Sequence, residues 1–454
     1  MVISLKSAAL AALSFLSFSN ATPMRVNWQR DASKTDATPD VAYKNVVYLA
    51  NRCLDPNGRN FQLSDLPVSQ ISHIIYAFAN VSSTGEVTLS NPYIDTQRRH
   101  DTSDSSTDTT TTLHGALSEL FALKKSNRHL KTLLSLGGPS CNSSFTTFIT
   151  NPSARHLFVT SALHLLTTLG LDGLDIDWEF PPSTTHGTAY LLLLRELRSA
   201  LDTYSASHPN PATNQPYHHL LTIASPTNPT DISHLGCLRS LARTIDWFNL
   251  MTYDFSGRWS PVSSHQSNLF SPSPSSQPPS SQPPSPSPQT KTPTGQKSPR
   301  RHQKSTQNAV NIYLTAGVPP SKLLLGMPIY GRSFRNTAGL GSPFSSSGEY
   351  TYNSLPVPIQ YDPTAGATYT YDPNKRELIS FDTPGMVERK VRWLREKRLG
   401  GAMFWEVSMD RKGEGSLVGA GFRALGGAGA GAGGLERGEN QVWYPESGWV
   451  NVRM

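Results

Sequence analysis

Apolar residues along this chain gather in short runs, and stretches with helical spacing of apolar and polar residues separate the runs. The runs lack the alternation of a half-exposed strand, so they predict strands that are buried on both faces. The predicted strands are residues 46–50, 73–79, 131–136, 173–178, 220–224, 247–251, 323–328 and 401–405. The helical patterns include residues 113–125, 154–169, 189–204, 308–316 and 385–398. This order favours an α/β fold, a (β/α)8 TIM barrel with its chemistry at the C-terminal ends of the strands.

Two stretches interrupt this pattern. Residues 271–305 are almost entirely Ser, Pro, Gln, Thr and basic residues, so they bury little apolar surface and predict a disordered insert after the sixth strand. Residues 336–384, between the seventh and eighth strands, are rich in Tyr, Thr and turn residues. We expect them to form a small α+β insertion, rich in strands, that walls one side of an active-site cleft.

The two ends of the chain differ in composition from the predicted barrel. Residues 1–21 hold one Lys, an apolar run too short to span a bilayer and a small-residue ending, which is typical of a secretory signal peptide. Residues 22–42 are polar and predict a propeptide or N-terminal arm ahead of a barrel over residues 43–425. Residues 426–454 begin with a Gly/Ala run, which predicts a flexible linker and a C-terminal tail. We therefore expect a secreted, extracellular protein without a membrane-spanning segment.

Charge and cysteine content exclude some classes of partner. The net charge of +7 is spread along the chain, and its two basic runs, residues 291–304 and 388–398, lack interleaved aromatic residues. This distribution argues against a nucleic-acid partner.

The cysteines are Cys53, Cys141 and Cys237. They allow at most one internal disulfide, and their spacing resembles no metal site, so no metal or cofactor is expected. Glycosylation triplets at residues 80–82 and 142–144 fit secretion.

The fourth predicted strand carries four carboxylates at the spacing D-x-x-D-x-D-x-E: Asp172, Asp175, Asp177 and Glu179. Because successive side chains of a strand point to opposite faces, the last three share one face and apolar residues line the other. Like charges at this spacing repel one another and are costly to bury, so a purely structural strand rarely carries them. The alternative to a functional role is an acidic strand exposed to solvent. Coupling pushes the pKa values of such carboxylates apart and keeps one group protonated. The row therefore favours general acid catalysis.

The segment D-G-L-D-I-D-W-E at residues 172–179 resembles the signature of glycoside hydrolase family 18, the chitinases and their relatives. Four further segments are similar to that family's motifs and follow in barrel order: Ser135-Leu-Gly-Gly138, Met251-Thr-Tyr-Asp254, residues 326–332 and residues 400–406. The resemblance runs from about residue 43 to residue 417, apart from the Pro/Ser-rich insert. In detail, including a Tyr-Pro-Glu-Ser segment near the end, the chain resembles secreted fungal endochitinases.

The resemblance implies a substrate-assisted mechanism without a protein nucleophile, in which the 2-acetamido carbonyl of the sugar attacks the anomeric carbon. Glu179 is then the general acid, and Asp177 hydrogen-bonds the N–H of the oxazolinium intermediate. Asp175 shares a proton with Asp177. Tyr253 hydrogen-bonds the acetamido oxygen and stabilises the charge that develops there.

The other matched positions are assigned to structural support or to substrate binding. The supporting residues are Asp172, at the base of the acidic row, and Gly137 and Gly138. The substrate-binding residues are Tyr48, Phe78, Met251, Asp254, Arg332 and Trp405. A structural alternative stays open for most of them: a rim ion pair for Asp254 and Arg332, and plain core positions for the three aromatic residues.

The function implied is that of a secreted, monomeric chitinase, which hydrolyses β-1,4 N-acetylglucosamine linkages of chitin or its oligomers with retention. The alternatives are a catalytically weak chitin-binding lectin of the same fold and an endo-β-N-acetylglucosaminidase acting on N-glycans. Several positions depart from the family pattern. Pro139 stands where many relatives have Trp, Arg52 replaces another Trp, and the insertion is short around residues 345–352. These losses of aromatic surface bear on substrate length and affinity but leave the acid in place.

Overall fold

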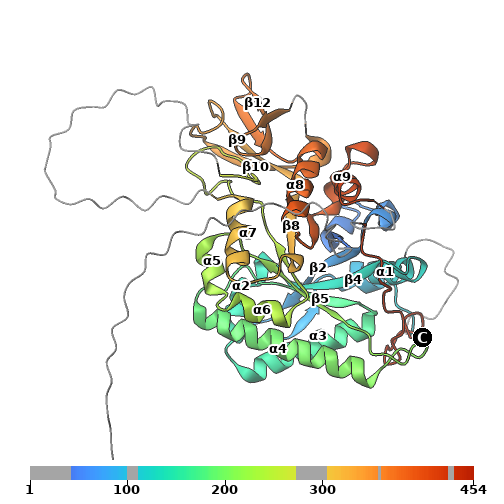
Figure 1. Cartoon of the computed structure of the whole chain (residues 1–454). Coiled ribbons are helices and arrows are strands. Elements are labelled where there is room, and N and C mark those ends of the chain that lie inside the picture. Colours follow the sequence, from blue (N-terminus) through green and yellow to red (C-terminus); the bar gives the residue numbers. More distant parts are fainter. Residues whose placement is uncertain (1–41, 100–110, 272–303, 356–358, 428–433, 454) are drawn as a thin grey trace, which may run out of the picture. The chain divides into compact units, whose positions relative to one another are not determined.

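The computed structural model describes residues 42–99, 111–271, 304–355, 359–427 and 434–453 (Figure 1). The predicted signal peptide, nearly all of the N-terminal arm, most of the Gly/Ala linker and all but the ends of the Pro/Ser-rich insert lie outside the described residues.

Eight parallel strands form a closed barrel. In chain order they are β1 (Lys44–Ala50), β2 (His73–Val81), β4 (Lys131–Gly137), β5 (Gly173–Asp177), β6 (Leu220–Ser225), β7 (Trp247–Leu250), β8 (Leu323–Pro328) and β14 (Gly401–Trp405). Each strand pairs with the next, and β1 pairs with both β14 and β2, which closes the ring. A short strand, β3 (Val87–Leu89), pairs antiparallel with β2. The predicted (β/α)8 barrel is confirmed.

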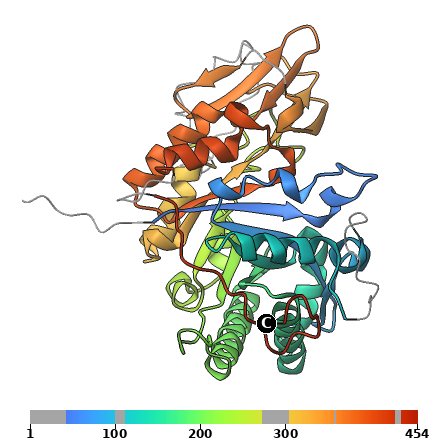
Figure 2. The ribbon, with the colours of Figure 1, turned by 90° about the vertical axis from the view of Figure 1, so that its right-hand side faces the viewer.

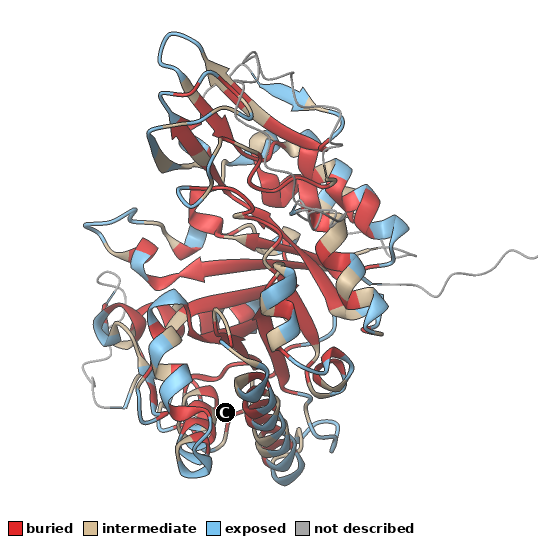
Figure 3. Ribbon diagram, turned by 90° about the vertical axis from the view of Figure 1, so that its left-hand side faces the viewer, coloured by how far each residue is buried: buried red, intermediate tan, exposed pale blue. Residues whose placement is uncertain are grey.

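Helices surround the ring and turn their polar faces to solvent, whereas the strands of the ring are buried along nearly all of their length (Figure 3). They are α1 (Gly115–Ser126), α2 (Asn142–Phe148), α3 (Pro152–Leu169), α4 (Thr184–Ser207), α5 (Pro229–His234), α6 (Leu238–Thr244), α7 (Thr306–Thr315), α8 (Pro384–Glu396) and α9 (Leu417–Ala424). Polar side chains cap several N-termini, among them Asn151, Ser183, Ser305 and Thr383. Each accepts a hydrogen bond from a first-turn N–H that otherwise lacks a partner, which fixes where the helix begins.

A second, antiparallel sheet lies between β8 and α8, on the opposite side of the barrel from α3 and α4 (Figure 1). Its strands are β9 (Tyr330–Arg335), β10 (Ser346–Thr351), β11 (Gln360–Asp362), β12 (Ala367–Asp372) and β13 (Glu377–Ser380), in the order β10-β9-β13-β12-β11. The sheet starts at residue 330, ahead of the expected residue 336, because the chain leaves β8 and enters β9 after one residue, Ile329.

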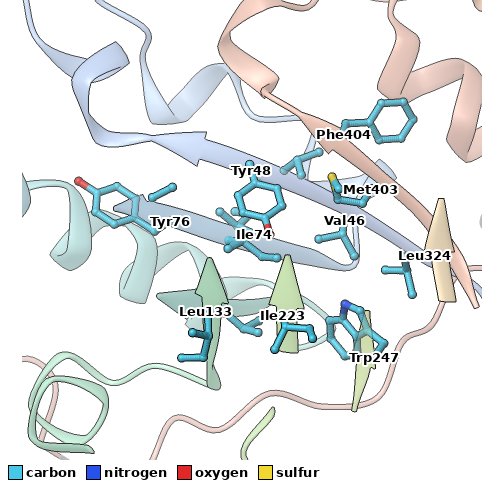
Figure 4. Packing of buried hydrophobic residues seen from close by; sticks show 14 of the residues in the cluster. Val46, Tyr48, Ile74, Tyr76, Leu133, Ile223, Trp247, Leu324, Met403 and Phe404 are labelled. Atoms are coloured by element: carbon cyan, nitrogen blue, oxygen red, sulfur yellow. The ribbon is translucent and has the colours of Figure 1, made fainter. Parts of the chain in front are cut away.

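Apolar side chains of successive strands fill the barrel (Figure 4). Val46, Trp247, Leu324 and Met403 come from four different strands and are at most 1 % exposed. This packing explains the sequence pattern, because strands enclosed by a packed interior and by outer helices present apolar residues on both faces.

The end of the chain crosses the barrel end at which the strands begin (Figure 2). Tyr444 is fully buried there, and its hydroxyl donates to the carbonyl oxygen of Leu171 at 2.7 Å. The side-chain amide of Asn440 donates to three carbonyl oxygens around the end of α1, those of Lys124, Asn127 and Leu130. The C-terminal segment is therefore part of the barrel's packed structure.

The three cysteines form no disulfide: Cys53 and Cys141 are buried thiols, and Cys237 is exposed. Among the described residues, no helix combines the length and the apolar character needed to cross a bilayer.

Candidate active site

The acidic row of β5 is divided between the two ends of the barrel. Asp175 and Asp177 lie within the strand and are 0 % and 4 % exposed. Glu179 follows the C-terminal end of the strand and is partly exposed. Asp172 precedes the strand and is fully buried at the opposite end.

Asp175 is the centre of a hydrogen-bond network that draws on four other strands. Its Oδ2 accepts from the hydroxyls of Tyr48 and Ser135, both at 2.8 Å. Its Oδ1 accepts from the Thr222 hydroxyl at 2.6 Å and from the Asn249 side-chain amide at 3.1 Å. Burial raises the pKa of Asp175, and these four hydrogen bonds oppose the rise because they favour the ionised form.

Asp177 has a different environment from Asp175. Its Oδ1 is buried and has no hydrogen-bond partner among the described residues. Burial, with the charges of Glu179 and Asp175, raises its pKa well above the ordinary value. The unpartnered oxygen is free to accept a hydrogen bond from a polar group of a ligand.

Burial also raises the pKa of Glu179, to about 7, and the nearby carboxylate of Asp254 adds to the rise. Glu179 is therefore protonated over much of the mildly acidic range, which is the state that a general acid requires. Its backbone is held by the side chain of Asn142 at the start of α2. The backbone N–H of Glu179 donates to Asn142 Oδ1 at 2.9 Å, and Asn142 Nδ2 donates to the Glu179 carbonyl oxygen.

Gly137 and Gly138 let the end of β4 approach the acidic strand closely. Both have positive φ angles, of 118° and 81°. A Cβ on Gly137 would lie 2.4 Å from the Asp177 carbonyl oxygen, and one on Gly138 would lie 3.0 Å from the ring of Phe78. The backbone N–H of Gly138 donates to that same Asp177 oxygen at 2.8 Å. A side chain at the first position would displace the backbone of β5 and one at the second would press on the Phe78 ring, and both positive φ angles favour glycine.

The residues after β7 approach the acidic row from two strands away in the ring. Tyr253 is 9 % exposed. Burial, followed by the charge of Asp177, raises the pKa of its phenol well above the ordinary value, so it is a neutral hydrogen-bond donor. Met251 is half-buried just past the strand, where its backbone N–H donates to the Ser225 carbonyl oxygen at 3.0 Å.

Asp254 and Arg332 form an ion pair at the rim. Nε and Nη2 of Arg332 each lie 2.8 Å from a different oxygen of Asp254, and the Tyr330 hydroxyl donates to Asp254 at 2.8 Å. Trp259, which is 52 % exposed, lies with its ring 5.4 Å from the Arg332 guanidinium. Through Tyr330 and Arg332 the second sheet contacts Asp254, the carboxylate that acts on Glu179, and Trp259 from the segment after β7 adds an exposed ring there.

Trp405, at the end of β14, joins an aromatic group with two of the other predicted substrate-binding residues. Its ring stacks on Phe78 with centroids 5.7 Å apart and is tilted against Tyr48 at 5.4 Å. Trp405 and Phe78 are partly exposed, whereas Tyr48 is 2 % exposed and its hydroxyl is bound to Asp175. Trp405 and Phe78 can therefore offer apolar surface to a ligand. Tyr48 instead donates a hydrogen bond to Asp175.

Asp172 belongs to a separate network. Its Oδ2 accepts from the Lys124 ammonium at 2.8 Å, and its Oδ1 accepts from the backbone N–H of Gln441 at 2.7 Å and from the Tyr217 hydroxyl at 3.1 Å. These contacts tie β5 to α1 and to the C-terminal segment. The structure therefore places Asp172 at the end of the barrel away from the other carboxylates.

The sequence pattern indicated the carboxylates but no role in the site for Ser135, Thr222, Asn249, Asn142 or Trp259. Thr222 and Asn249 are polar residues inside otherwise apolar strands, which was a usable signal for an inward-facing role. Nothing in the sequence places Asn142 beside Glu179. Among the described residues, no group of three or more His, Cys, Asp or Glu side chains is arranged to hold a metal ion.

Comparison with known proteins agrees with this geometry. Residues 44–410 match the family model for glycosyl hydrolases family 18. The chain belongs to this family. It is 36 % identical over 421 residues to Chitinase 1 of Aphanocladium album and 38 % identical over 423 residues to Endochitinase 1 of Metarhizium robertsii, covering 90 % of each chain in both comparisons. The family member described here is therefore a glycoside hydrolase.

Solved structures share the fold. Chitinase ChiA74 from Bacillus thuringiensis superimposes with a TM-score of 0.72 at 25 % identity, over 86 % of this chain and 70 % of the other. The class V chitinase from Nicotiana tobaccum in complex with NAG4 gives 0.65 at 25 % identity, over 85 % and 99 %.

Proposed function

We propose that this glycoside hydrolase is a secreted chitinase that cleaves β-1,4 linkages between N-acetylglucosamine residues with retention. Relatives named as chitinases and endochitinases, and a similar structure in complex with NAG4, support chitin oligomers as its substrate. The signal-peptide pattern of residues 1–21 supports secretion.

The observation that carries the proposal is the contrast between the two buried aspartates. Four hydrogen bonds satisfy Asp175, whereas Asp177 keeps an oxygen without a partner at the C-terminal end of the strand. A buried polar atom without a partner is costly unless a ligand completes it. The N–H of a 2-acetamido group supplies the missing donor, and this hydrogen bond aims the acetamido carbonyl at the anomeric carbon.

The remaining groups then act in sequence. Glu179 donates its proton to the glycosidic oxygen as that bond breaks, and the acetamido oxygen forms a bond to the anomeric carbon. Tyr253 hydrogen-bonds the acetamido oxygen and Asp177 hydrogen-bonds the N–H of the resulting oxazolinium ion. Asp175, held by its network, exchanges a proton with Asp177. Glu179, now ionised, takes a proton from water, which opens the oxazolinium ion and restores the starting anomer.

Apolar surface near the acid is available for sugar rings. Trp405, backed by Phe78, forms the floor beneath the sugar whose linkage is cleaved. Trp259 presents an exposed ring for a neighbouring sugar, steadied by the Arg332 guanidinium. The Asp254–Arg332 pair is placed to bind sugar hydroxyls at the rim.

Incubation with chitin hexamer tests the proposal. We expect shorter oligomers whose new reducing ends first appear as the β-anomer, as seen by NMR within minutes of mixing. Products of the α-anomer would refute the retaining mechanism. Binding of the hexamer without products would identify a lectin. Cleavage of N-glycans in preference to the hexamer would identify an endo-β-N-acetylglucosaminidase.

A further inference from the structure

Asn142 is both the first residue of α2 and the first residue of an N-glycosylation triplet, Asn142-Ser-Ser144. The triplet makes it a candidate acceptor for a glycan in a secreted protein. In the folded chain, however, both polar atoms of its side chain are engaged. Oδ1 accepts from the Glu179 backbone N–H at 2.9 Å, and Nδ2 donates to the Glu179 carbonyl oxygen. These two hydrogen bonds to one residue clamp the backbone that carries the general acid.

The clamp depends on the chemistry of a primary amide. Such a group presents a donor hydrogen and an acceptor oxygen along the same edge, and this edge pairs with the N–H and C=O of one extended residue. A glycan converts the side chain into a secondary amide, and secondary amides are almost always trans. The remaining N–H of a trans amide points away from its own oxygen. The sugar then replaces the hydrogen that donates to Glu179, so a glycosylated Asn142 cannot make both hydrogen bonds.

We propose that Asn142 is a positioning residue for Glu179 and that activity requires it to remain unglycosylated. The inference rests on the proposed function, since it concerns the acid of that reaction. The second triplet differs, because Asn80 is exposed at the end of β2. A glycan at Asn80 leaves the Asn142 clamp intact.

The clamp is tested with two variants and one matched control. Asn142→Ala removes both hydrogen bonds. Asn142→Asp keeps the size of the side chain but sets a carboxylate oxygen against the Glu179 carbonyl oxygen. Ser144→Ala abolishes the triplet and leaves the amide unchanged. All three are assayed on chitin hexamer, and their thermal unfolding is compared.

We expect kcat to fall about 10- to 100-fold in both Asn142 variants, because small displacements of a catalytic group have effects of this size. KM should stay within about twofold, since the sugar-binding side chains are untouched. Ser144→Ala should match the parent. If Asn142 served only to fill space, Asn142→Asp would retain the parent kcat, and that result would overturn the proposal. A parent enzyme without activity on the hexamer would instead refute the proposed function.

The glycosylation half is tested on the parent enzyme secreted from a fungal host that attaches N-glycans. Glycopeptide mass spectrometry locates the sugars, and lectin chromatography separates the forms. We expect Asn142 to be unmodified, or modified only in a fraction whose kcat is lower by the same factor as in Asn142→Ala. A fraction that is fully modified at Asn142 and has the parent kcat would refute the proposal.

Discussion

The charge of Asp254 offers a test of how the site sets the pKa of its acid. Burial is the largest cause of the raised pKa of Glu179, and the Asp254 carboxylate is the next. Asp254→Asn removes that charge and also frees the Arg332 guanidinium, so both changes favour the ionised form of Glu179. The basic limb of activity, along which Glu179 loses its proton, should therefore move to lower pH.

The expected size of the change in the Glu179 pKa follows from how far the Asp254 and Arg332 side chains are exposed to solvent. A neighbouring charge at close range moves a pKa by about 1 to 3. The side chains of Asp254 and Arg332 are 35 % and 20 % exposed, so solvent screens the pair and the low end of that range applies. We expect the basic limb to move from about pH 7 to about pH 6, which corresponds to about 1.4 kcal/mol. It should stay above the ordinary value for glutamate because burial is unchanged.

Two further variants make the test specific. Arg332→Met leaves Asp254 unpaired, which strengthens its field at Glu179, so the basic limb should move to higher pH. Glu349→Gln removes a carboxylate that also contacts Arg332, at 3.2 Å, but that is not among the causes of the Glu179 shift, so the profile should not move.

The assay is kcat/KM from pH 4 to pH 9 on a fluorogenic chitobiose glycoside, because this ratio reports the groups of the free enzyme. Shifts of the same sign in Asp254→Asn and Arg332→Met would contradict the electrostatic account. An unmoved limb in both variants would show that Asp254 does not act on the titrating group.

Three other substitutions probe separate parts of the structure. Glu179→Gln should bind chitin hexamer with near-parent affinity in calorimetry while losing several orders of magnitude in kcat, and near-normal turnover would remove Glu179 as the acid. Gly137→Ala should destabilise the fold by about 3 kcal/mol or more, because the new Cβ meets the Asp177 carbonyl oxygen at 2.4 Å and the backbone has a φ of 118°. A midpoint of urea unfolding equal to the parent's would refute the close approach. Tyr444→Ala should cost about 3–5 kcal/mol in urea unfolding, because a fully buried ring and its hydrogen bond are lost, and a cost below about 1 kcal/mol would show that the C-terminal segment does not support the barrel.

Local pattern was enough to predict the barrel and the acidic row. Strands enclosed on both faces must be apolar along their length, so eight such runs can be read without knowing their partners. The alternation of a strand likewise fixes that Asp175, Asp177 and Glu179 share one side. Their motif, together with Tyr253 and Trp405, carried the resemblance to a family to which the chain does belong.

The partners of these carboxylates were decided by the closed barrel alone. Asp175 receives hydrogen bonds from Tyr48, 127 residues away, and from Asn249, 74 residues away. Asp172, which the motif places at the base of the acidic row, precedes the strand and binds the C-terminal segment at the opposite end of the barrel, a partner that no local pattern indicates.

The hydrogen bonds to Asp175 and Asp172, and the hold of Asn142 on Glu179, exist because the closed barrel brings residues that are distant in sequence together, at one end around Asp172 and at the other around Glu179. The sequence by itself determined which groups are the candidates for the chemistry, since their identity and parity are local properties. Tertiary structure decided that the hydrogen bonds of Asp175 are satisfied, that Asp177 keeps an oxygen without a partner among the described residues and that Asn142 holds the backbone of Glu179, since those are properties of neighbours that local pattern does not encode.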